Sequence, residues 1–377
     1  MKVLFTVQGE GRGHFTQALS LKEMLERHGH RVVGVVVGSN GTRPLPDYFP
    51  ASFAVPVETI ASPGFNFRQA RGVSSLASLR DFLRGLPAYR RSLRHLRRVL
   101  RKTAPDLAIN FLEPVMGLNN LIFGAWVPTL VVGHQYMLEH PAFPRVTKFR
   151  PHQLGMRAYI ALVGARSSRL ALSFYPAAGL SAKPLTVCPP LLRGRVQALE
   201  PAAGDYLLVY LLNHGYAEHV LQWHTLHPHV PVHCFHDRPG APAEDRVRPN
   251  LTFHRLDGEK FLRLMAGCRA VATTAGFETA CEAAYLGKPL LMVPVENHVE
   301  QHLNACDAEH TGLGIRDETF QLSRLWGLHT GESHTAFRHW VQRAEAIAMR
   351  AVGDCVGNRA EVLDAVPVSP VASESAA

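Results

Sequence analysis

The chain has 377 residues, of which 46% are hydrophobic and 19% are charged. This length and composition predict a globular protein with room for two domains, and no apolar run reaches the ~18–20 residues that span a bilayer. The formal net charge of +9 indicates an anionic partner, and charge alone leaves nucleic acid, a membrane surface and a phosphorylated substrate open. The six cysteines lack paired spacing and the 21 histidines lack zinc-ligand spacing, so we expect reduced thiols, no metal site and a cytoplasmic protein.

The first predicted element is a strand over residues 2–7, too short to act as a signal peptide. The sequence QGEGRGH follows, then a helix over 15–28 and a strand over 31–37, an order typical of a doubly wound parallel sheet. The glycines do not fit Gly-x-Gly-x-x-Gly, and no acidic residue ends the second strand, so a dinucleotide site is not expected. His14 directly follows the last glycine, where a neutral imidazole could accept a hydroxyl proton or simply cap the helix.

Residues 80–102 carry nine arginine and lysine residues against one acid, Asp81, together with an apolar stripe at helical spacing. They predict a basic amphipathic helix that Pro87 kinks or breaks. Such a helix could lie on an anionic membrane or meet an anionic acceptor. The alternative is a helix whose apolar face packs on the sheet and whose arginines are merely solvated.

Two further buried strands are predicted at residues 105–110 and 129–133. Glu113 follows the first of them, and His134 and Gln135 follow the second. Ligands of open α/β sheets gather at the carboxyl ends of such strands, so His134 and Gln135 are candidate contacts for a substrate.

A proline-containing segment without a sustained period separates two α/β series. The expected organisation is a first domain, a linker, a second domain, a carboxy-terminal helix and a disordered tail, over residues 1–188, 189–204, 205–335, 336–365 and 366–377.

The densest group of candidate binding residues lies in residues 271–315, VATTAGFETACEAAYLGKPLLMVPVENHVEQHLNACDAEHTGLGI. The predicted order is strand, small-residue turn, helix and strand, over 270–273, 274–276, 277–286 and 290–293. The start of this helix presents unpaired N–H groups and the positive end of the helix dipole, which attract a phosphate. Further along, Glu282 could reach vicinal hydroxyls, and three more polar residues could hold a polyhydroxylated ring: Glu300, Gln301 and Asn304.

Segment 271–315 and the glycine-rich QGEGRGH resemble the GT-B glycosyltransferases, above all the MurG-like group and its bacterial and archaeal relatives. In segment 271–315 the order and spacing agree over more than about forty positions, far more than in a lone glycine motif. The resemblance implies an α/β fold class with two Rossmann-like doubly wound parallel-sheet domains facing a cleft. The first domain would bind the acceptor and the second the nucleotide-sugar donor. It also implies that helix 336–365 packs back on the first domain.

The resemblance also implies roles for individual residues. His14 would be the catalytic base and Glu113 the carboxylate that orients its ring, although Asn110 stands where the relatives often have an acid. The expected donor phosphate contacts are Gly11, Gly13, Thr274, Ala275, Gly276 and Phe277. The expected ribose and sugar contacts are Glu282, Glu300, Gln301 and Asn304, the backbone at Leu256 would hold the base, and the candidate acceptor contacts are His134 and Gln135.

The expected activity is metal-independent, inverting transfer of a hexosyl group from a nucleotide sugar, expected to be a UDP-sugar, to a hydroxyl acceptor, with no further cofactor. A lipid-linked acceptor, or an anionic membrane surface met by residues 80–102, would place the protein peripherally on the inner face of the plasma membrane. No nucleic-acid partner is expected, because the basic helix carries few aromatic residues and no nucleic-acid module is recognised. Two alternatives stay open: a nucleotide-sugar epimerase or hydrolase on the same fold, and a non-catalytic nucleotide-sugar-binding subunit.

Overall fold

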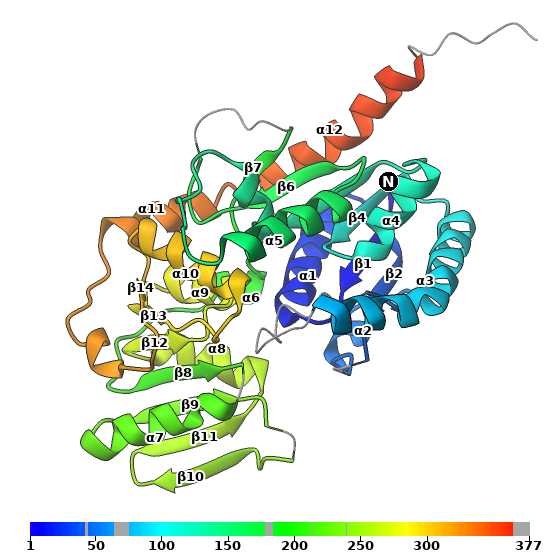
Figure 1. Cartoon of the computed structure of the whole chain (residues 1–377). Coiled ribbons are helices and arrows are strands. Elements are labelled where there is room, and N and C mark those ends of the chain that lie inside the picture. Colours follow the sequence, from blue (N-terminus) through cyan, green and yellow to red (C-terminus); the bar gives the residue numbers. More distant parts are fainter. Residues whose placement is uncertain (42–43, 64–74, 178–183, 213, 239, 365–377) are drawn as a thin grey trace, which may run out of the picture.

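A computed structural model describes the chain except for residues 42–43, 64–74, 178–183, 213, 239 and 365–377. The described residues form two lobes, each built on a seven-stranded sheet flanked by helices (Figure 1). The tail predicted at 366–377 lies outside the described residues.

The first sheet is parallel throughout and has the order β3-β2-β1-β4-β5-β6-β7. Its strands are β1 (Lys2–Gln8), β2 (Arg31–Ser39), β3 (Val57–Ala61), β4 (Leu107–Phe111), β5 (Thr129–Gly133), β6 (Ser168–Leu172) and β7 (Thr186–Cys188). The helices of this lobe are α1 (Arg12–Arg27), α2 (Tyr48–Ala51), α3 (Ser75–Thr103), α4 (Pro114–Phe123), the 3-10 helix η1 (His134–Glu139) and α5 (Arg150–Val163). The strand order reverses between β1 and β4, and a crevice for ligands forms at such a point.

The second sheet repeats this plan with the order β10-β11-β9-β8-β12-β13-β14, and only the edge pair β10–β11 among its described strands is antiparallel. Its strands are β8 (Leu207–Leu211), β9 (Val232–His236), β10 (Glu244–Arg248), β11 (Leu251–Arg255), β12 (Ala270–Thr273), β13 (Leu290–Met292) and β14 (Ile315–Arg316). The helices are α6 (Gly194–Gln197), η2 (His214–Tyr216), α7 (Ala217–Leu226), α8 (Gly258–Gly267), α9 (Phe277–Tyr285), α10 (Val299–His310), η3 (Leu322–Leu325), α11 (Glu332–Val341) and α12 (Ala344–Asp364). Two Rossmann-like lobes therefore face each other, as the sequence predicts.

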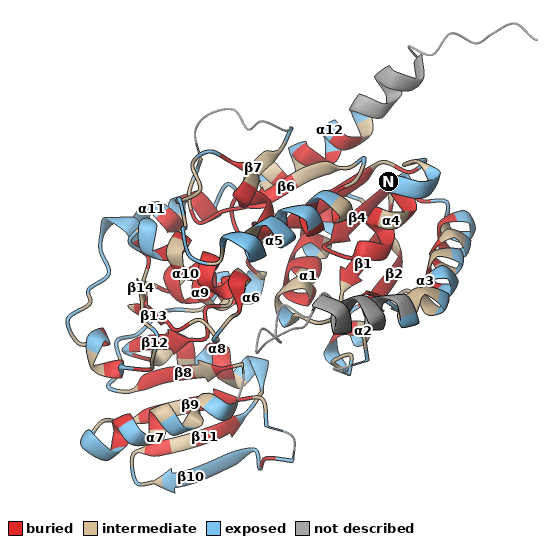
Figure 2. Ribbon diagram, viewed as in Figure 1, coloured by how far each residue is buried: buried red, intermediate tan, exposed pale blue. Residues whose placement is uncertain are grey.

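The core lies on both faces of each sheet. Every residue of β4 and of β5 is buried, which explains why these strands are continuous apolar runs without alternation. The helices bury the sides that face the sheets and expose the others (Figure 2). No helix within the described part of the chain has both the length and the apolar character needed to cross a bilayer.

Three helices differ from the sequence prediction. The first helix begins at Arg12 and not at residue 15, so His14 lies in its first turn. Helix α3 runs without interruption through Pro87, because its second half is held on the sheet by buried apolar residues such as Leu96 and Leu100, which compensate the lost hydrogen bond. The helix expected over 336–365 is two helices, α11 and α12.

Helix α12 returns from the second lobe and packs on β5, β6 and β7 of the first (Figure 1). The crossing is fixed by side chains: Trp340 Nε1 donates to the Ser173 carbonyl at 3.0 Å, and Arg27 pairs with Glu345 at 2.7 Å. The two lobes are thus joined both by the segment before β8 and by this crossing.

Candidate active site

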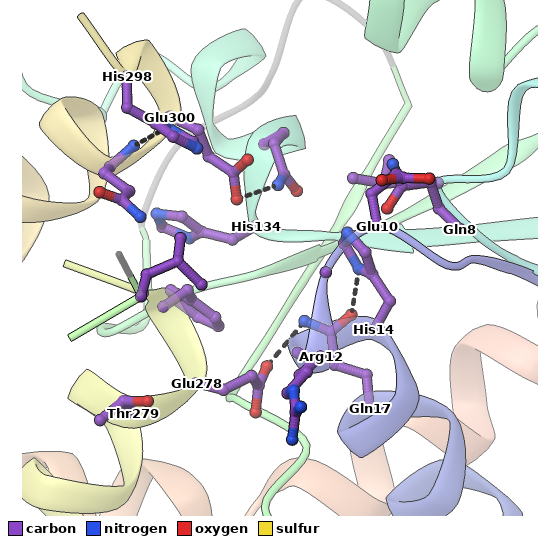
Figure 3. Close-up of a pocket in the computed structure, with 18 of the residues that line it drawn as sticks. Gln8, Glu10, Arg12, His14, Gln17, His134, Glu278, Thr279, His298 and Glu300 are labelled. Carbon is purple, nitrogen blue, oxygen red and sulfur yellow. Dashed lines mark hydrogen bonds between the residues drawn. The ribbon is translucent and has the colours of Figure 1, made fainter. Parts of the chain in front are cut away.

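A cleft lies between the lobes, at the carboxyl ends of the central strands of both sheets (Figure 3). The residues that line it from the first lobe are Gln8, Glu10, Gly11, Arg12, Gly13, His14, Gln17, Leu112, His134, Gln135, Met156 and Tyr159. Those from the second lobe are Tyr210, Leu212, Thr274, Gly276, Phe277, Glu278, Thr279, His298, Glu300 and Gln301. The cleft therefore combines the two glycine-containing segments that the sequence analysis singled out.

The turn between β12 and α9 is braced so that the start of α9 opens into the cleft. Ala275 adopts a left-handed conformation with φ of 50°, and Asn304 Nδ2 donates to its carbonyl at 3.1 Å. Thr274 Oγ1 accepts a hydrogen bond from the backbone N–H of Leu212 at 3.1 Å. Gly276 is the N-cap of α9 and supplies no capping side chain, so the N–H groups of the first turn remain available to an anion.

His14 lies on the opposite wall, in the first turn of α1 (Figure 3). Its Nδ1 lies 3.3 Å from Gln17 Oε1, an atom that only accepts, so Nδ1 carries the proton. Partial burial lowers the pKa of His14 to about 4, and the hydrogen bond that Nδ1 donates to Gln17 Oε1 opposes this shift. His14 is consequently a neutral imidazole at neutral pH, the form that can accept a proton.

Gln17 extends from His14 to the second lobe. Its Nε2 donates to Glu278 Oε1 at 2.7 Å. The amide of Gln17 thus accepts from His14 on α1 and donates to Glu278 on α9 (Figure 3). Gly13 lies against this contact, because a Cβ atom there would stand 3.0 Å from Glu278 Cγ. Burial raises the pKa of Glu278 to about 8.

The structure does not bring Glu113 to His14. Glu113 caps α4: its Oε1 accepts from the backbone N–H of Val115 at 3.0 Å and from Ser62 Oγ at 2.8 Å. The carboxylate also lies against Gly38 at the end of β2, where any Cβ atom would collide with it. Burial raises the pKa of Glu113 to about 7. The polar partner of His14 is Gln17 instead, and Glu113 is absent from the cleft lining.

Glu282 was predicted to contact ribose or sugar hydroxyls, but its carboxylate forms an ion pair with Arg193 instead. Arg193 Nη2 lies 2.6 Å from Glu282 Oε1, with side chains that are 12% and 6% exposed. Arg193 precedes α6, in the segment that joins the lobes. Leu256 packs against the hydrophobic core, and neither Glu282 nor Leu256 lines the cleft.

Breaking the Arg193–Glu282 pair is expected to destabilise the protein. Arg193→Ala leaves a buried carboxylate without its cation, which costs about 3 kcal/mol of unfolding free energy, measured by urea denaturation. The matched control is Lys22→Ala, which removes the more exposed Lys22–Glu26 pair and costs less than about 1 kcal/mol. Equal losses in the two variants would show that the burial of the pair has no effect.

The predicted acceptor residues and two of the predicted sugar residues meet on one wall. Gln135 Nε2 donates to Glu300 Oε1 across the lobes at 2.9 Å. His134 Nδ1 donates to the Leu172 carbonyl at 2.8 Å, and its ring stacks on Phe277 with centroids 4.1 Å apart. Gln301 Oε1 accepts from the backbone N–H of Val295 at 2.8 Å, and Gln301 lines the cleft.

Several residues of the cleft were not singled out in the sequence. Gln17 and Glu278 had a local signal: Gln17 follows His14 by three positions on one helix face, and Glu278 stands in the first turn of the helix expected to meet a phosphate. Arg12 stands within the glycine-rich segment and supplies a cation. Gln8 and Glu10 stand in the same glycine-rich segment, whereas His298 had no local signal.

The two Rossmann-like lobes, with a cleft between them, have the arrangement of the GT-B fold. A family model described as glycosyl transferase family 1 matches residues 1–326, so the chain belongs to this family. An uncharacterized glycosyltransferase of Methanopyrus kandleri, MK0977, is 35% identical over 85 residues. That match spans 22% of this chain and 25% of the relative's length.

Solved structures share the whole fold at low sequence identity. The glycotransferase of kitacinnamycin superposes with a TM-score of 0.63 at 15% identity, covering 94% of this chain and 98% of that one. UGT2 of Phytolacca americana, complexed with UDP-2fluoro-glucose and pterostilbene, gives a TM-score of 0.59 at 12% identity, with 95% and 99% covered. MurG of Acinetobacter baumannii gives 0.50 at 16% identity, with 96% and 99% covered. At these identities the likeness concerns the fold.

Proposed function

We propose that the protein transfers a hexosyl group from a UDP-sugar to a hydroxyl acceptor, with inversion and without a metal ion. The observation that carries this proposal is the placement of an uncapped helix start, at Gly276, opposite a neutral imidazole, His14, in one cleft. A helix start binds a diphosphate, and a neutral imidazole accepts a hydroxyl proton. The UDP-sugar bound by the structurally similar plant UGT2 supports the choice of nucleotide.

In the proposed reaction His14 Nε2 takes the proton of the acceptor hydroxyl. The hydroxyl oxygen forms a bond to the anomeric carbon from the face opposite the diphosphate, and the bond between that carbon and the diphosphate oxygen breaks. The electron pair leaves with UDP, whose charge is stabilised by the N–H groups at the start of α9 and by Arg12. One direct displacement inverts the anomeric centre.

Nucleotide binding can be measured without knowing the acceptor. In a thermal-shift panel of nucleoside diphosphates, UDP at about 100 times its Kd is expected to add about 2.7 kcal/mol of stability and raise Tm, whereas ADP, GDP and CDP at the same concentration raise it less. A larger shift with another base would contradict the proposed donor. Analysis of the products formed from the UDP-sugar with no acceptor present separates transfer from hydrolysis or epimerisation.

We further propose that the acceptor is presented at an anionic membrane, on whose cytoplasmic side the protein binds peripherally. Helices α3 and α4 pack together, and α3 exposes Arg91, Arg94 and Arg98. The end of α4 and the residues after it expose large apolar side chains, namely Leu121, Ile122, Phe123 and Trp126. The Arg97 guanidinium lies 3.9 Å from the centre of the Phe123 ring. Cations beside exposed apolar and aromatic groups are typical of surfaces that bind anionic lipid.

This surface predicts lipid-dependent sedimentation. The protein should bind vesicles that contain phosphatidylglycerol and not vesicles of phosphatidylcholine alone, and binding should weaken as salt increases. The variant R91E/R94E/R98E should lose at least about 3 kcal/mol of this binding, at roughly 1 kcal/mol for each cation removed, and the three new carboxylates add repulsion. The control R246E/R255E/R263E changes three arginines of the second lobe and should bind as the unchanged protein does. Equal loss in both triple variants would refute a specific surface.

A further inference from the structure

The chain of side chains that runs from His14 through Gln17 to Glu278 is the feature that the proposed reaction leaves unexplained. It crosses between the lobes, since His14 and Gln17 lie on α1 and Glu278 lies on α9 (Figure 3). Gln17 and Glu278 are both buried, at 4% and 8% exposure. Two buried polar residues from different lobes thus meet directly behind the proposed base.

The direction of the hydrogen bonds in this chain is fixed at its far end. Gln17 Nε2 donates to Glu278 Oε1 at 2.7 Å, and an ionised Glu278 carboxylate can only accept. The amide of Gln17 therefore turns its NH2 group toward Glu278 and its oxygen toward His14. That oxygen accepts only from a protonated Nδ1, so the lone pair of the imidazole is on Nε2.

We propose that Glu278 is a positioning residue of the second lobe that, through Gln17, fixes His14 in the tautomer whose Nε2 can accept the acceptor proton. This inference rests on the proposed function, in which His14 is the base. If the anchor at Glu278 is removed, the amide of Gln17 can turn over and present its NH2 group to Nδ1. Nδ1 then becomes the acceptor, Nε2 carries the proton, and the base is blocked.

The surroundings of the chain agree with this role. His14 Nε2 has no hydrogen-bond partner within the described residues and lies beside the backbone of Gly11, where a Cβ atom would be 3.8 Å away. Gly13 gives Glu278 the space to reach Gln17. Burial raises the pKa of Glu278 to about 8, and the hydrogen bond from Gln17 opposes that rise because it stabilises the ionised carboxylate, which can only accept.

Because the anchor and the base belong to different lobes, the tautomer is fixed only when the lobes are closed. An opening of the cleft would separate Gln17 from Glu278 and free the amide to turn. The base would then be correctly protonated only around a bound donor, which limits transfer of the sugar to water.

The test compares three variants by the kcat for the UDP-sugar, the Kd of UDP and the tautomer of His14. Glu278→Met keeps the side-chain length but cannot accept a hydrogen bond. Q17E/E278Q exchanges the two groups: the carboxylate at position 17 accepts from His14 Nδ1 and from the amide at position 278, which restores the direction of the chain. The matched control is Glu259→Met, which changes the exposed first-turn acid of α8.

We expect Glu278→Met to lower kcat by roughly 10- to 1,000-fold while the Kd of UDP changes less than about threefold. Q17E/E278Q should have a higher kcat than Glu278→Met, and Glu259→Met should retain the original kcat. Loss of UDP affinity with an unchanged kcat would overturn the inference, and so would a double variant no better than Glu278→Met.

The tautomer is read directly by NMR of protein labelled with ¹⁵N-histidine, with the His14 signals identified by their absence in His14→Ala. We expect a protonated Nδ1 in the unchanged protein and in Q17E/E278Q, and a protonated Nε2 in Glu278→Met. The same tautomer in the unchanged protein, in Q17E/E278Q and in Glu278→Met would overturn the inference, even if UDP binds and sugar is transferred. Failure of UDP to bind would instead contradict the proposed function. The NMR spectra would still report the tautomer of His14, so the two failures can be told apart.

Discussion

His14→Ala is expected to lower kcat by about 10²- to 10⁴-fold and to leave the Kd of UDP within about threefold, because the imidazole acts on the acceptor and not on the nucleotide. The measurement is steady-state transfer from the UDP-sugar together with UDP titration of the same preparations. An unchanged kcat would mean that His14 takes no part in the chemistry and only forms part of the first turn of α1.

The pH dependence of kcat tests the role of His14 independently of the substitution. Because the pKa of His14 is lowered to about 4, its neutral form persists well below pH 6.5, and the acid limb of the kcat profile should fall near pH 4 to 5.

The lowered pKa of His14 also makes stability depend on pH. The unfolded chain takes up a proton at this histidine near pH 6.5, and the folded chain does so only near pH 4. His14 therefore costs stability as pH falls from 6.5 to 4, and His14→Ala should lose less stability over that window.

Gly276→Asp is expected to weaken UDP binding by roughly 100-fold, equivalent to about 2.7 kcal/mol. Gly276 has the extended backbone of an N-cap, and nothing lies within 4 Å of a Cβ atom there, so the side chain is accommodated. The new carboxylate occupies the N–H groups of α9 and repels the diphosphate, while its capping bond leaves Tm unchanged or raises it.

Two controls separate charge from size at position 276. Gly276→Ala adds a methyl group to open space and should leave UDP binding within about threefold. Gly276→Asn has the shape of aspartate without its charge and should fall between the two. Tight UDP binding by Gly276→Asp, measured by calorimetry, would mean that the diphosphate binds away from α9.

Much of the fold follows from local sequence. The strands Ala270–Thr273 and Thr129–Gly133 have the bounds predicted from their apolar runs, and α9 begins at the predicted residue. These elements are buried on both faces or end at glycine, so the signal that defines them is contained in a few consecutive residues.

The contacts between side chains far apart in the sequence could not be predicted in this way. Gln17 and Glu278 are 261 positions apart, and their hydrogen bond depends on how the lobes close. Arg193 and Glu282 are 89 positions apart, and they meet because the segment that joins the lobes passes beside α9. The expected partner of His14, Glu113, is at the predicted strand end, but the cap of α4 and Ser62 determine where its carboxylate points.

The central claim is that the start of α9 binds the diphosphate of a UDP-sugar opposite His14. A crystal structure with UDP tests it most directly. We expect diphosphate oxygens within hydrogen-bond distance of the backbone N–H groups that follow Gly276, with Arg12 nearby. A diphosphate bound elsewhere, with these N–H groups facing only solvent, would contradict it.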